Sequence, residues 1–557
     1  MFKEIPWLER EEFDSLDDFL RNFKLNTPEI FNFGFDVVDR IAAADPGRRA
    51  LQWCNDAGEE RLFTMNDISK WSNRAANAFW DLGIRRGDKV MLVLKRRYEY
   101  WFALVALAKI GAVAIPATNM LKPHDIVYRV QRGEIKMLLC VNDQELIASV
   151  TEAEKEISIP VKAVVGNVKI DGWLDFDGLM ENAAESLADD RCARDTGAKD
   201  TMMVYFTSGT SGMPKMVAHD FLYPLGHIVT AKYWQHVEHG GLHLTVAETG
   251  WAKASWGKIY GQWICGSAIM VYDMERFNAA DLLGIVQKYK VTTFCAPPTV
   301  YRFFIKEDLS KYDWSCVHHC TTAGEALHPE VFEQFHRAMG LRIYEGFGQT
   351  ESTAITANFY WVDPKPGSMG IPAPSYKVCI LDDDGKPCEN GEEGQVCISL
   401  SGGKPCGLFN GYYKDPELTA SQWHDGFYHT GDVAWKDEDG FLWFVGRADD
   451  VIKSSGYRIG PFEVESALMQ HPAVTECAIT AAPDPVRGQV VKATILLTRG
   501  FEPSDALVKE LQDHVKKVTA PYKYPRIIEF VDELPKTISG KIRHKAIRQK
   551  DAEKASS

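Results

Sequence analysis

Short apolar runs alternate with amphipathic stretches from about residue 60 onward. Residues 89–95, an apolar run between two lysines, and the apolar residues 111–115 stand on either side of residues 99–109, which follow a helical pattern. This alternation is typical of a strand, a crossover helix and a second strand, so it predicts a largely parallel sheet covered by helices. Ligands of such α/β folds bind where strands end in loops. Further strands of this kind are expected at residues 136–140, 202–206, 291–295 and 342–344.

The pattern changes after about residue 365. Short strands separated by turn signals, as in residues 378–385 and 393–398, predict a small antiparallel unit that resembles a barrel. Helical and strand patterns then alternate through the last hundred residues, which indicates a separate α+β module. In that module we expect helices at residues 461–470 and 504–518 and strands at residues 475–480 and 490–497.

Composition adds limits on function. The chain has 557 residues, 45% of them hydrophobic and 25% charged, which is typical of a soluble globular protein of several units. Its net charge of −14 argues against a nucleic-acid partner, but this charge does not exclude a local basic pocket that binds a small anion. The 12 cysteines lack the paired spacing of a zinc site or a redox dithiol, which favours reduced thiols.

The first twenty residues carry seven acidic and two basic side chains, the wrong sign for a secretory or transit peptide. The longest uncharged stretches are shorter than the roughly 18 to 20 apolar residues that span a bilayer. We therefore predict a cytoplasmic protein without an integral membrane segment.

Residues 205–215 hold the most informative pattern, in which hydroxyl residues, glycines and a lysine follow an apolar strand. Glycines let the backbone approach a ligand closely, so successive N–H groups could bind a polyphosphate. The segment is not a Walker loop, because Pro214 precedes Lys215 and Met216 follows it. A flexible surface turn is the alternative. The predicted phosphate contacts are Thr207, Ser208, Gly209, Thr210, Ser211, Gly212 and Lys215.

This loop resembles the phosphate-binding signature of the adenylate-forming superfamily, which includes acyl-CoA synthetases, peptide-synthetase adenylation domains and luciferases. Five further matching segments follow in the family's order, and the whole chain most resembles the medium-chain acyl-CoA synthetases. The segments are Ala-Gly-Glu at 323–325, Tyr-Glu-Gly-Phe-Gly-Gln-Thr-Glu at 344–351, Tyr-His-Thr-Gly-Asp at 428–432, and residues 446–460 and 535–541.

The resemblance implies an ATP site around residues 344–351. Thr350 would contact the α-phosphate and the acyl carboxylate, and Glu351 would bind Mg²⁺. One carboxylate together with substrate phosphates is a usual way to hold Mg²⁺. The other ATP contacts implied here are Gly324, Glu325, Glu345, Gly346, Phe347, Gly348 and Gln349.

Four charged residues complete the implied ATP site. Asp432 and Arg447 match the family's ribose contacts, and Arg458 matches an arginine that reaches the α-phosphate. Lys541 matches the catalytic lysine, whose ammonium would stabilise negative charge on the α-phosphate during carboxylate attack. Without the surrounding motifs, a lone Asp or Arg would be read as a surface ion pair, and Lys541 as part of a basic tail.

Asp449 corresponds to the hinge about which the family's C-terminal domain turns. The resemblance therefore implies two domains, 1–448 and 449–557, the first with two layered α/β subdomains and the barrel-like unit, the second small, mobile and α+β. One orientation would bring Lys541 to ATP, and the other would bring Ser455, Gly456 and Tyr457 to the CoA channel. Weaker matches to the family's CoA contacts are Arg487, Lys516, Tyr524 and Arg526.

The acyl group is constrained by Gly348. Acetyl-CoA synthetases place a bulky Trp directly before the Gln-Thr-Glu triplet, where it caps a pocket for one methyl group. Gly348 in its place predicts a deeper pocket, in which each buried methylene adds about 0.8 kcal/mol of binding. Trp251 and Trp256 occupy the segment that, by resemblance, lines this pocket together with Thr350, although either could be ordinary core.

Two other clusters are weaker candidates for a metal site. The segment Cys316-Val-His-His-Cys320 contains four zinc-ligand types, but adjacent residues on a strand point to opposite faces and cannot close one tetrahedron. His236, His239 and His243 have no recognisable partner ligands and are expected to be exposed or locally hydrogen-bonded.

We therefore predict an ATP-, Mg²⁺- and CoA-dependent acid:thiol ligase. It would convert a medium-chain, branched or aromatic acid to its CoA thioester through an acyl-AMP intermediate, releasing AMP and pyrophosphate. The alternatives are an adenylating enzyme with a carrier protein or an amine as acceptor, an acetyl- or propionyl-CoA synthetase, and a nucleotide-sensing protein without chemistry. The sequence is also compatible with a homodimer.

Overall fold

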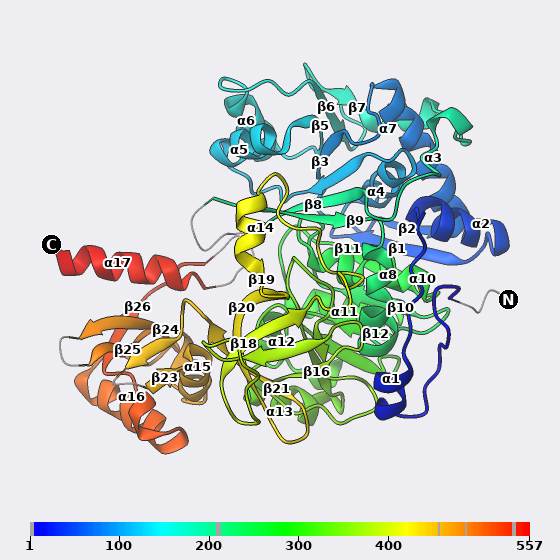
Figure 1. Cartoon of the computed structure of the whole chain (residues 1–557). Coiled ribbons are helices and arrows are strands. Elements are labelled where there is room, and N and C mark those ends of the chain that lie inside the picture. Colours follow the sequence, from blue (N-terminus) through cyan, green and yellow to red (C-terminus); the bar gives the residue numbers. More distant parts are fainter. Residues whose placement is uncertain (1–4, 208–212, 455–456, 485–486, 537–541, 557) are drawn as a thin grey trace.

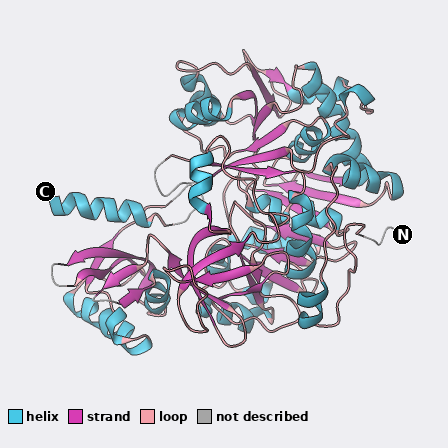
Figure 2. Cartoon of the chain, viewed as in Figure 1, coloured by secondary structure: helices cyan, strands magenta, loops and turns pink. Residues whose placement is uncertain are grey.

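The computed structural model describes residues 5–207, 213–454, 457–484, 487–536 and 542–556 (Figure 1). Within them, strands form three sheets, and helices pack around these sheets (Figure 2). In the described part of the chain, no helix is both long and apolar enough to cross a membrane.

The first sheet, in the upper part of Figure 1, has the order β7-β6-β5-β3-β4-β8-β9. Its strands are parallel except for the β8–β9 hairpin. The fully buried helix α4 (Glu99–Lys109) connects β3 to β4, which confirms the predicted strand–helix–strand unit. The strands are β3 (Lys89–Val93), β4 (Val113–Pro116), β5 (Ile135–Val141), β6 (Val161–Val165), β7 (Leu174–Asp175), β8 (Thr201–Thr207) and β9 (Lys215–Asp220).

The second sheet has a parallel core in the order β14-β13-β12-β10-β11-β1, with β2 antiparallel at its edge. The predicted runs at 291–295 and 342–344 fall on β12 and β14, which lie on either side of β13. The strands are β1 (Arg49–Asn55), β2 (Glu60–Thr64), β10 (Leu242–Thr245), β11 (Ala268–Asp273), β12 (Thr293–Cys295), β13 (His319–Thr322) and β14 (Ile343–Phe347).

The antiparallel strands expected after residue 365 are present, and they continue the second sheet through β15 and β16. Hydrogen bonding therefore runs without a break from the parallel core into this unit. Its strands are β15 (Thr356–Ala357), β16 (Ser368–Pro372), β17 (Val378–Leu381), β18 (Gly394–Ser399), β19 (Trp423–His424), β20 (Phe427–Lys436) and β21 (Leu442–Arg447).

Helices fill the connections of these two sheets. Several begin with a side-chain cap, such as Thr64 on α3 and Asn278 on α11. The α-helices of this part are α1 (Leu16–Asn22), α2 (Arg40–Ala44), α3 (Met65–Asp81), α5 (Pro123–Gly133), α6 (Gln144–Ala153), α7 (Phe176–Asn182), α8 (Tyr223–Ile228), α9 (Lys253–Gly257), α10 (Tyr260–Ile264), α11 (Ala279–Tyr289), α12 (Pro298–Phe304), α13 (Pro329–Met339) and α14 (Pro416–Gln422).

The third sheet belongs to the C-terminal α+β unit, orange to red in Figure 1. It meets the rest of the protein at His328, whose ring stacks on Phe462 with 5.3 Å between centroids and whose Nδ1 lies 3.1 Å from Ser466 Oγ. The elements are β22 (Ile452–Ser454), β23 (Tyr457–Ile459), β24 (Val474–Asp484), β25 (Gly488–Leu497), β26 (Ile527–Val531), α15 (Pro461–Met469), α16 (Asp505–Val518) and α17 (His544–Ser556).

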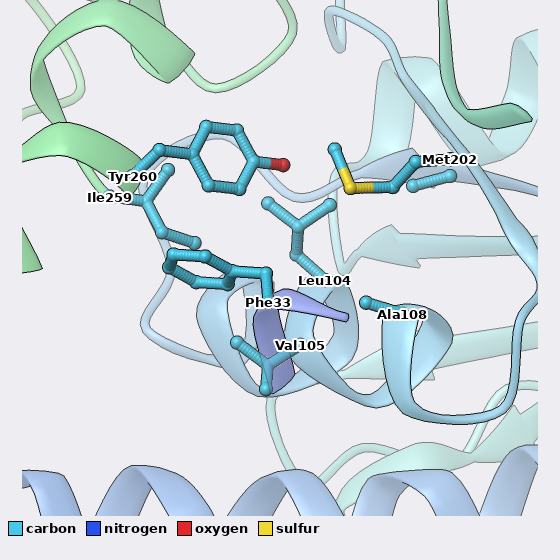
Figure 3. A pocket seen from close by; sticks show the side chains of 8 residues that line it. Phe33, Leu104, Val105, Ala108, Met202, Ile259 and Tyr260 are labelled. Atoms are coloured by element: carbon cyan, nitrogen blue, oxygen red, sulfur yellow. The ribbon is translucent and has the colours of Figure 1, made fainter. Parts of the chain in front are cut away.

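The core between α4 and α10 is closely packed. A cavity of about 10 Å³ lies there. Figure 3 shows the side chains that line it, among them Phe33, Leu104, Met202 and Tyr260. This volume is at the lower limit for one water molecule, so the cavity is a packing defect and not a ligand site.

Candidate active site

A cavity of about 1150 Å³ opens where the carboxyl ends of both parallel sheets converge. Residues that line it directly follow β3, β4 and β5 of the first sheet and β10 to β14 of the second, and β8 contributes its last residues. This is the place where α/β folds bind ligands. The lining residues are 95–96, 119–122, 143–145, 149, 205–207, 246–248, 250–253, 256, 274–275, 297, 323–325 and 348–350.

Gln349 connects the loop after β14 to β20. Its side-chain nitrogen donates to the Asp432 carboxylate and, over 2.8 Å, to the carbonyl oxygen of Thr430. Tyr428 donates its hydroxyl to Gln349 Oε1 over 2.6 Å. These bonds fix the rim of the cavity against the strand that carries Asp432.

Asp432 and Arg447 face each other on β20 and β21, where they are paired in register. Arg447 Nη1 lies 3.1 Å from Asp432 Oδ1 and also donates to the carbonyl oxygen of Thr430. Burial lowers the pKa of Arg447, but the charge and hydrogen bond of Asp432, together with the charges of Asp449 and Tyr428, outweigh it, so the net shift is upward. The structure therefore brings the two predicted ribose contacts together as one ion pair beside Gln349.

Glu351, the predicted Mg²⁺ ligand, is held by Tyr412. The Tyr412 hydroxyl donates to Glu351 Oε1 over 3.0 Å, and the ammonium of Lys215 lies 5.1 Å from the centre of the Tyr412 ring. Burial raises the pKa of Glu351 above 4.5, opposed by Tyr412 and Lys215.

No group of three or more His, Cys, Asp or Glu among the described residues could hold a metal by itself. The one carboxylate of Glu351 fits a Mg²⁺ ion that arrives with nucleotide phosphates, because Mg²⁺ is usually shared between one or two carboxylates and the phosphates.

Gly324 and Glu325 line the cavity directly after β13. Gly324 has a φ of +103°, a value that L-residues rarely adopt, and Glu325 accepts a hydrogen bond from Thr299 over 3.2 Å. By contrast, Glu345 is buried on β14, where Leu327 N donates to it over 3.3 Å, and burial raises its pKa well above 4.5. Gly346 and Phe347 also lie on β14 and are absent from the described cavity lining.

Aromatic side chains line part of the cavity, among them Tyr205, Trp251 and Trp256. Gly348 also lines this cavity, but the position that its missing side chain would take is occupied. A Cβ atom at this glycine would lie 2.5 Å from Cη2 of Trp256, because the indole already fills that volume. The space that the missing side chain would leave is taken by a Trp from another segment.

Several predicted residues fall outside the described residues: Ser208, Gly209, Thr210, Ser211, Gly212, Ser455, Gly456 and Lys541. For Tyr457 and Arg458 the backbone is described, on β23, but the side chains are not. Thr207 ends β8 at the cavity and pairs with Lys215 across the hairpin.

The predicted CoA contacts divide into two places. Lys516 and Arg526 lie on the ring of Tyr524, at 4.4 and 4.7 Å from its centre. Arg487 lies apart from them, at the turn between β24 and β25, where its backbone N–H donates to Asp484. The described lining of the cavity comes only from residues 95–350, so none of these four residues is part of it.

The predicted hinge residue Asp449 lies two residues after the end of β21, and its carboxylate is 4.0 Å from the Arg447 guanidinium. Its neighbour Asp450 forms an ion pair with Arg548 of α17. The last helix of the chain is therefore tied to the start of the C-terminal unit.

Sequence reasoning missed two tyrosines that organise the site. Tyr428 begins one of the matching motifs, so a search for hydrogen-bond partners of Gln349 could have found it. Tyr412 has no such signal, because its contact with Glu351 joins residues 61 positions apart.

Comparison with known proteins supports the interpretation of this cavity as the active site of an AMP-binding enzyme. The family model described as AMP-binding enzyme matches residues 38–413, and that of the AMP-binding enzyme C-terminal domain matches residues 463–541. The human (Homo sapiens) mitochondrial acyl-coenzyme A synthetase ACSM3 is 40% identical over 552 residues, covering 97% of this chain and 93% of that protein.

Solved structures agree with this likeness. The anthranilate CoA ligase AuaEII, in complex with anthranoyl-AMP, matches with a TM-score of 0.86 and 28% identity over 95% of this chain and 99% of its own. A benzoate CoA ligase from Burkholderia xenovorans matches with a TM-score of 0.81 and 26% identity over 93% of this chain and 100% of its own. The chain thus belongs to the family of AMP-binding enzymes, with the fold of its acid–CoA ligases.

Proposed function

We propose that the protein is an ATP-dependent acid:CoA ligase that activates its acid as an acyl adenylate and then transfers the acyl group to the CoA thiol. The observation that carries this proposal is one cavity that is lined both by the motif residues Gln349 and Thr350 and by the aromatic residues Trp251 and Trp256. A carboxylic acid and the α-phosphate of ATP could meet within it. The adenylate-bound relative described above supports this arrangement.

In the first step, a carboxylate oxygen would attack the α-phosphorus of ATP, forming the acyl–AMP bond and releasing pyrophosphate. Thr350 lines the cavity, and we assign it the contact to both the α-phosphate and the acyl carboxylate. Asp432 and Arg447 would bind the ribose, and Arg458 and Lys541 would stabilise charge on the α-phosphate. Phosphoryl transfer is accelerated mainly by such positioning and electrostatic stabilisation.

Magnesium is part of the proposal. When bound between Glu351 and the ATP phosphates, the ion would neutralise phosphate charge during the attack. Tyr412 orients the Glu351 carboxylate from the opposite side.

The second step needs CoA at the adenylate carbonyl. We propose that residues 449–557 turn about Asp449 between the two steps, as one unit against residues 1–448. Among the described residues, this unit contacts the rest of the protein through stacking of Phe462 on His328, the polar contact of Ser466 with His328 and the packing of Phe462 on Phe444, a partly polar interface of the kind that breaks and forms again.

The decisive experiment is CoA-dependent AMP release by the purified protein across short, medium, branched and aromatic acids. An acid:CoA ligase requires both the acid and CoA for release. Acid-dependent ATP–pyrophosphate exchange with no response to CoA would favour an adenylating enzyme with another acceptor, and no exchange with any acid would favour a binding protein.

The working compartment and assembly are also proposals. All 12 cysteines are free, which supports a reducing compartment such as the cytoplasm, whereas the human relative is named as mitochondrial. Fractionation of the native host distinguishes the two. A homodimer is tested by the molar mass in solution from light scattering.

A further inference from the structure

A buried histidine on β9 holds the backbone of Thr350. His219 Nε2 lies 2.7 Å from the carbonyl oxygen of Thr350, in the loop that follows β14. In the described part of the chain no other donor contacts that oxygen. The two residues are 131 positions apart in the sequence, so the contact ties the β8–β9 hairpin to the loop that carries the Gln-Thr-Glu triplet.

The His219 ring acts as a donor of fixed direction. A carbonyl oxygen can only accept a hydrogen bond, so Nε2 of His219 carries the proton. The side chain is fully buried, and this burial lowers its pKa to about 3, so the ring is neutral at neutral pH. The Tyr223 ring stacks on it with 3.8 Å between centroids, which fixes the plane of the imidazole.

The same strand also supports the next residue of the triplet. Val217 of β9 forms a β-bridge with Tyr412, and the Tyr412 hydroxyl donates to the Glu351 carboxylate. One strand therefore holds two successive residues of the site, Thr350 through His219 and Glu351 through Tyr412. The first contact fixes a backbone group and the second a side chain.

We propose that His219 is a positioning residue for adenylate formation, which fixes the backbone of Thr350 so that the Thr350 hydroxyl meets the α-phosphate and the acyl carboxylate. This inference rests on the proposed ligase function and adds to it a residue outside the matching segments. A buried carbonyl that loses its donor turns toward another partner. A displacement of about 1 Å is enough to slow a positioned reaction by about a hundredfold.

The first test removes the donor and then restores it. His219→Leu should lower kcat for acid-dependent ATP–pyrophosphate exchange at least about tenfold, because Thr350 is misplaced. The KM for ATP should change less than about threefold, since Asp432 and Arg447 remain in place. His219→Gln, whose amide nitrogen can donate to the same oxygen, should recover kcat to within about threefold of the wild type. A Gln variant no faster than the Leu variant overturns the proposal.

His319 on β13 offers a matched control. It is also buried, its Nε2 lies 2.8 Å from the carbonyl oxygen of Trp234, and its ring stacks on Tyr344 with 4.1 Å between centroids. His319→Leu should therefore lower the unfolding midpoint about as much as His219→Leu, but keep kcat for exchange within about threefold of the wild type. Equal losses of kcat in the two variants would mean general disruption and overturn the proposal.

A second test asks whether His219 acts through Thr350. Thr350→Val removes the hydroxyl and keeps the backbone carbonyl. The double variant His219→Leu/Thr350→Val should then lose no more than about threefold beyond Thr350→Val alone. Losses that multiply would show that the two residues act independently, against the proposal. Circular dichroism shows whether each variant is folded, and His219→Phe, which keeps a stacked ring without the donor, replaces His219→Leu if the latter does not fold.

The pH dependence separates positioning from proton transfer. A neutral His219 that only positions Thr350 gives the same shape of the kcat–pH profile in the wild type and in His219→Gln. Loss of one limb of the profile in His219→Gln would assign a proton transfer to His219 and overturn the positioning role.

The two proposals fail in different ways. A wild type inactive with every acid refutes the ligase function. A wild type that releases AMP with acid and CoA, but whose kcat responds to His219 no more than to His319, refutes only the positioning role.

Discussion

At the scale of single residues, Glu351 is the proposed Mg²⁺ ligand. Its carboxylate accepts a hydrogen bond from Tyr412, and its pKa is raised because burial disfavours the charged form. A divalent cation would restore that form. A proton and Mg²⁺ would therefore compete for the same group.

Glu351→Gln should raise the Mg²⁺ concentration for half-maximal ATP–pyrophosphate exchange at least about tenfold, because a neutral amide cannot balance the cation. In the wild type this concentration should rise as the pH falls toward the raised pKa of Glu351, and in the variant it should not. Tyr412→Phe, which removes only the hydrogen bond, should have a smaller effect. Identical Mg²⁺ dependence in wild type and Glu351→Gln would remove Glu351 from the metal site.

At the scale of elements, β15 and β16 join the parallel core to the antiparallel unit that carries Asp432. Gly370 on β16 has a φ of +82°, and a Cβ there would lie 2.0 Å from the carbonyl carbon of Ala357 on β15. Two short strands thus pass so closely that only glycine fits.

Gly370→Ala should lower stability by about 3 kcal/mol or more, since the side chain must push backbone atoms apart in addition to the strain of its positive φ. Gly385→Ala is the control, because Gly385 has a φ of +76° and nothing within 4 Å of its Cβ position. That control should cost only about 1 to 2 kcal/mol. Equal shifts of the urea unfolding midpoint would show that contact with β15 does not matter.

Helices α15 and α17 are joined by an ion pair whose strength depends on pH. His544 Nε2 lies 2.8 Å from Glu465 Oε1. Burial opposes the charged imidazole, but the hydrogen bond and charge of Glu465 outweigh it, so the pKa of His544 is raised above 6.5. The stabilisation is therefore complete below the pKa of the unfolded state and is lost as the pH rises through the raised value.

His544→Gln should lower stability by about 1 to 2 kcal/mol at about pH 6, and this difference should shrink as the pH rises to about 9. Thermal unfolding midpoints of the two proteins across this range measure it. His424→Gln is the control, since its pair with Asp425 is exposed on the surface. A pH-independent difference for His544→Gln would mean that the pair contributes packing and not charge.

At the scale of the whole molecule, the proposed ligase would use its C-terminal unit in two orientations. The described residues on either side of Lys541 are paired, with a bridge between Lys536 and Ile542. The residues that flank Lys541 therefore belong to the C-terminal unit. Asp450 and Arg548 connect α17 to the residues that follow the proposed hinge.

Lys541→Ala should reduce adenylate formation at least about a thousandfold and leave the conversion of supplied acyl-adenylate and CoA largely intact. Pyrophosphate exchange measures the first half-reaction, and thioester formation from synthetic acyl-AMP measures the second. An equal loss in both would contradict two orientations with separate tasks.

The amino-acid sequence by itself determined the secondary structure around the site and the identity of most polar residues in it. Strands such as β3, β8 and β14 and helix α4 are encoded by local hydrophobic periodicity, and Gln349, Thr350, Asp432 and Arg447 lie in contiguous motifs. These signals depend only on residues that are close together in the sequence, so they can be recognised without a structure.

Tertiary structure alone decided the shape of the acyl pocket and the partners of the charged groups. Whether Gly348 leaves a space depends on Trp256, and the orientation of Glu351 depends on Tyr412, each far away in the sequence. Packing between distant segments fills volume without leaving a periodic or local pattern. The sequence therefore placed a glycine where a pocket could open, and only the folded chain showed an indole lying in it.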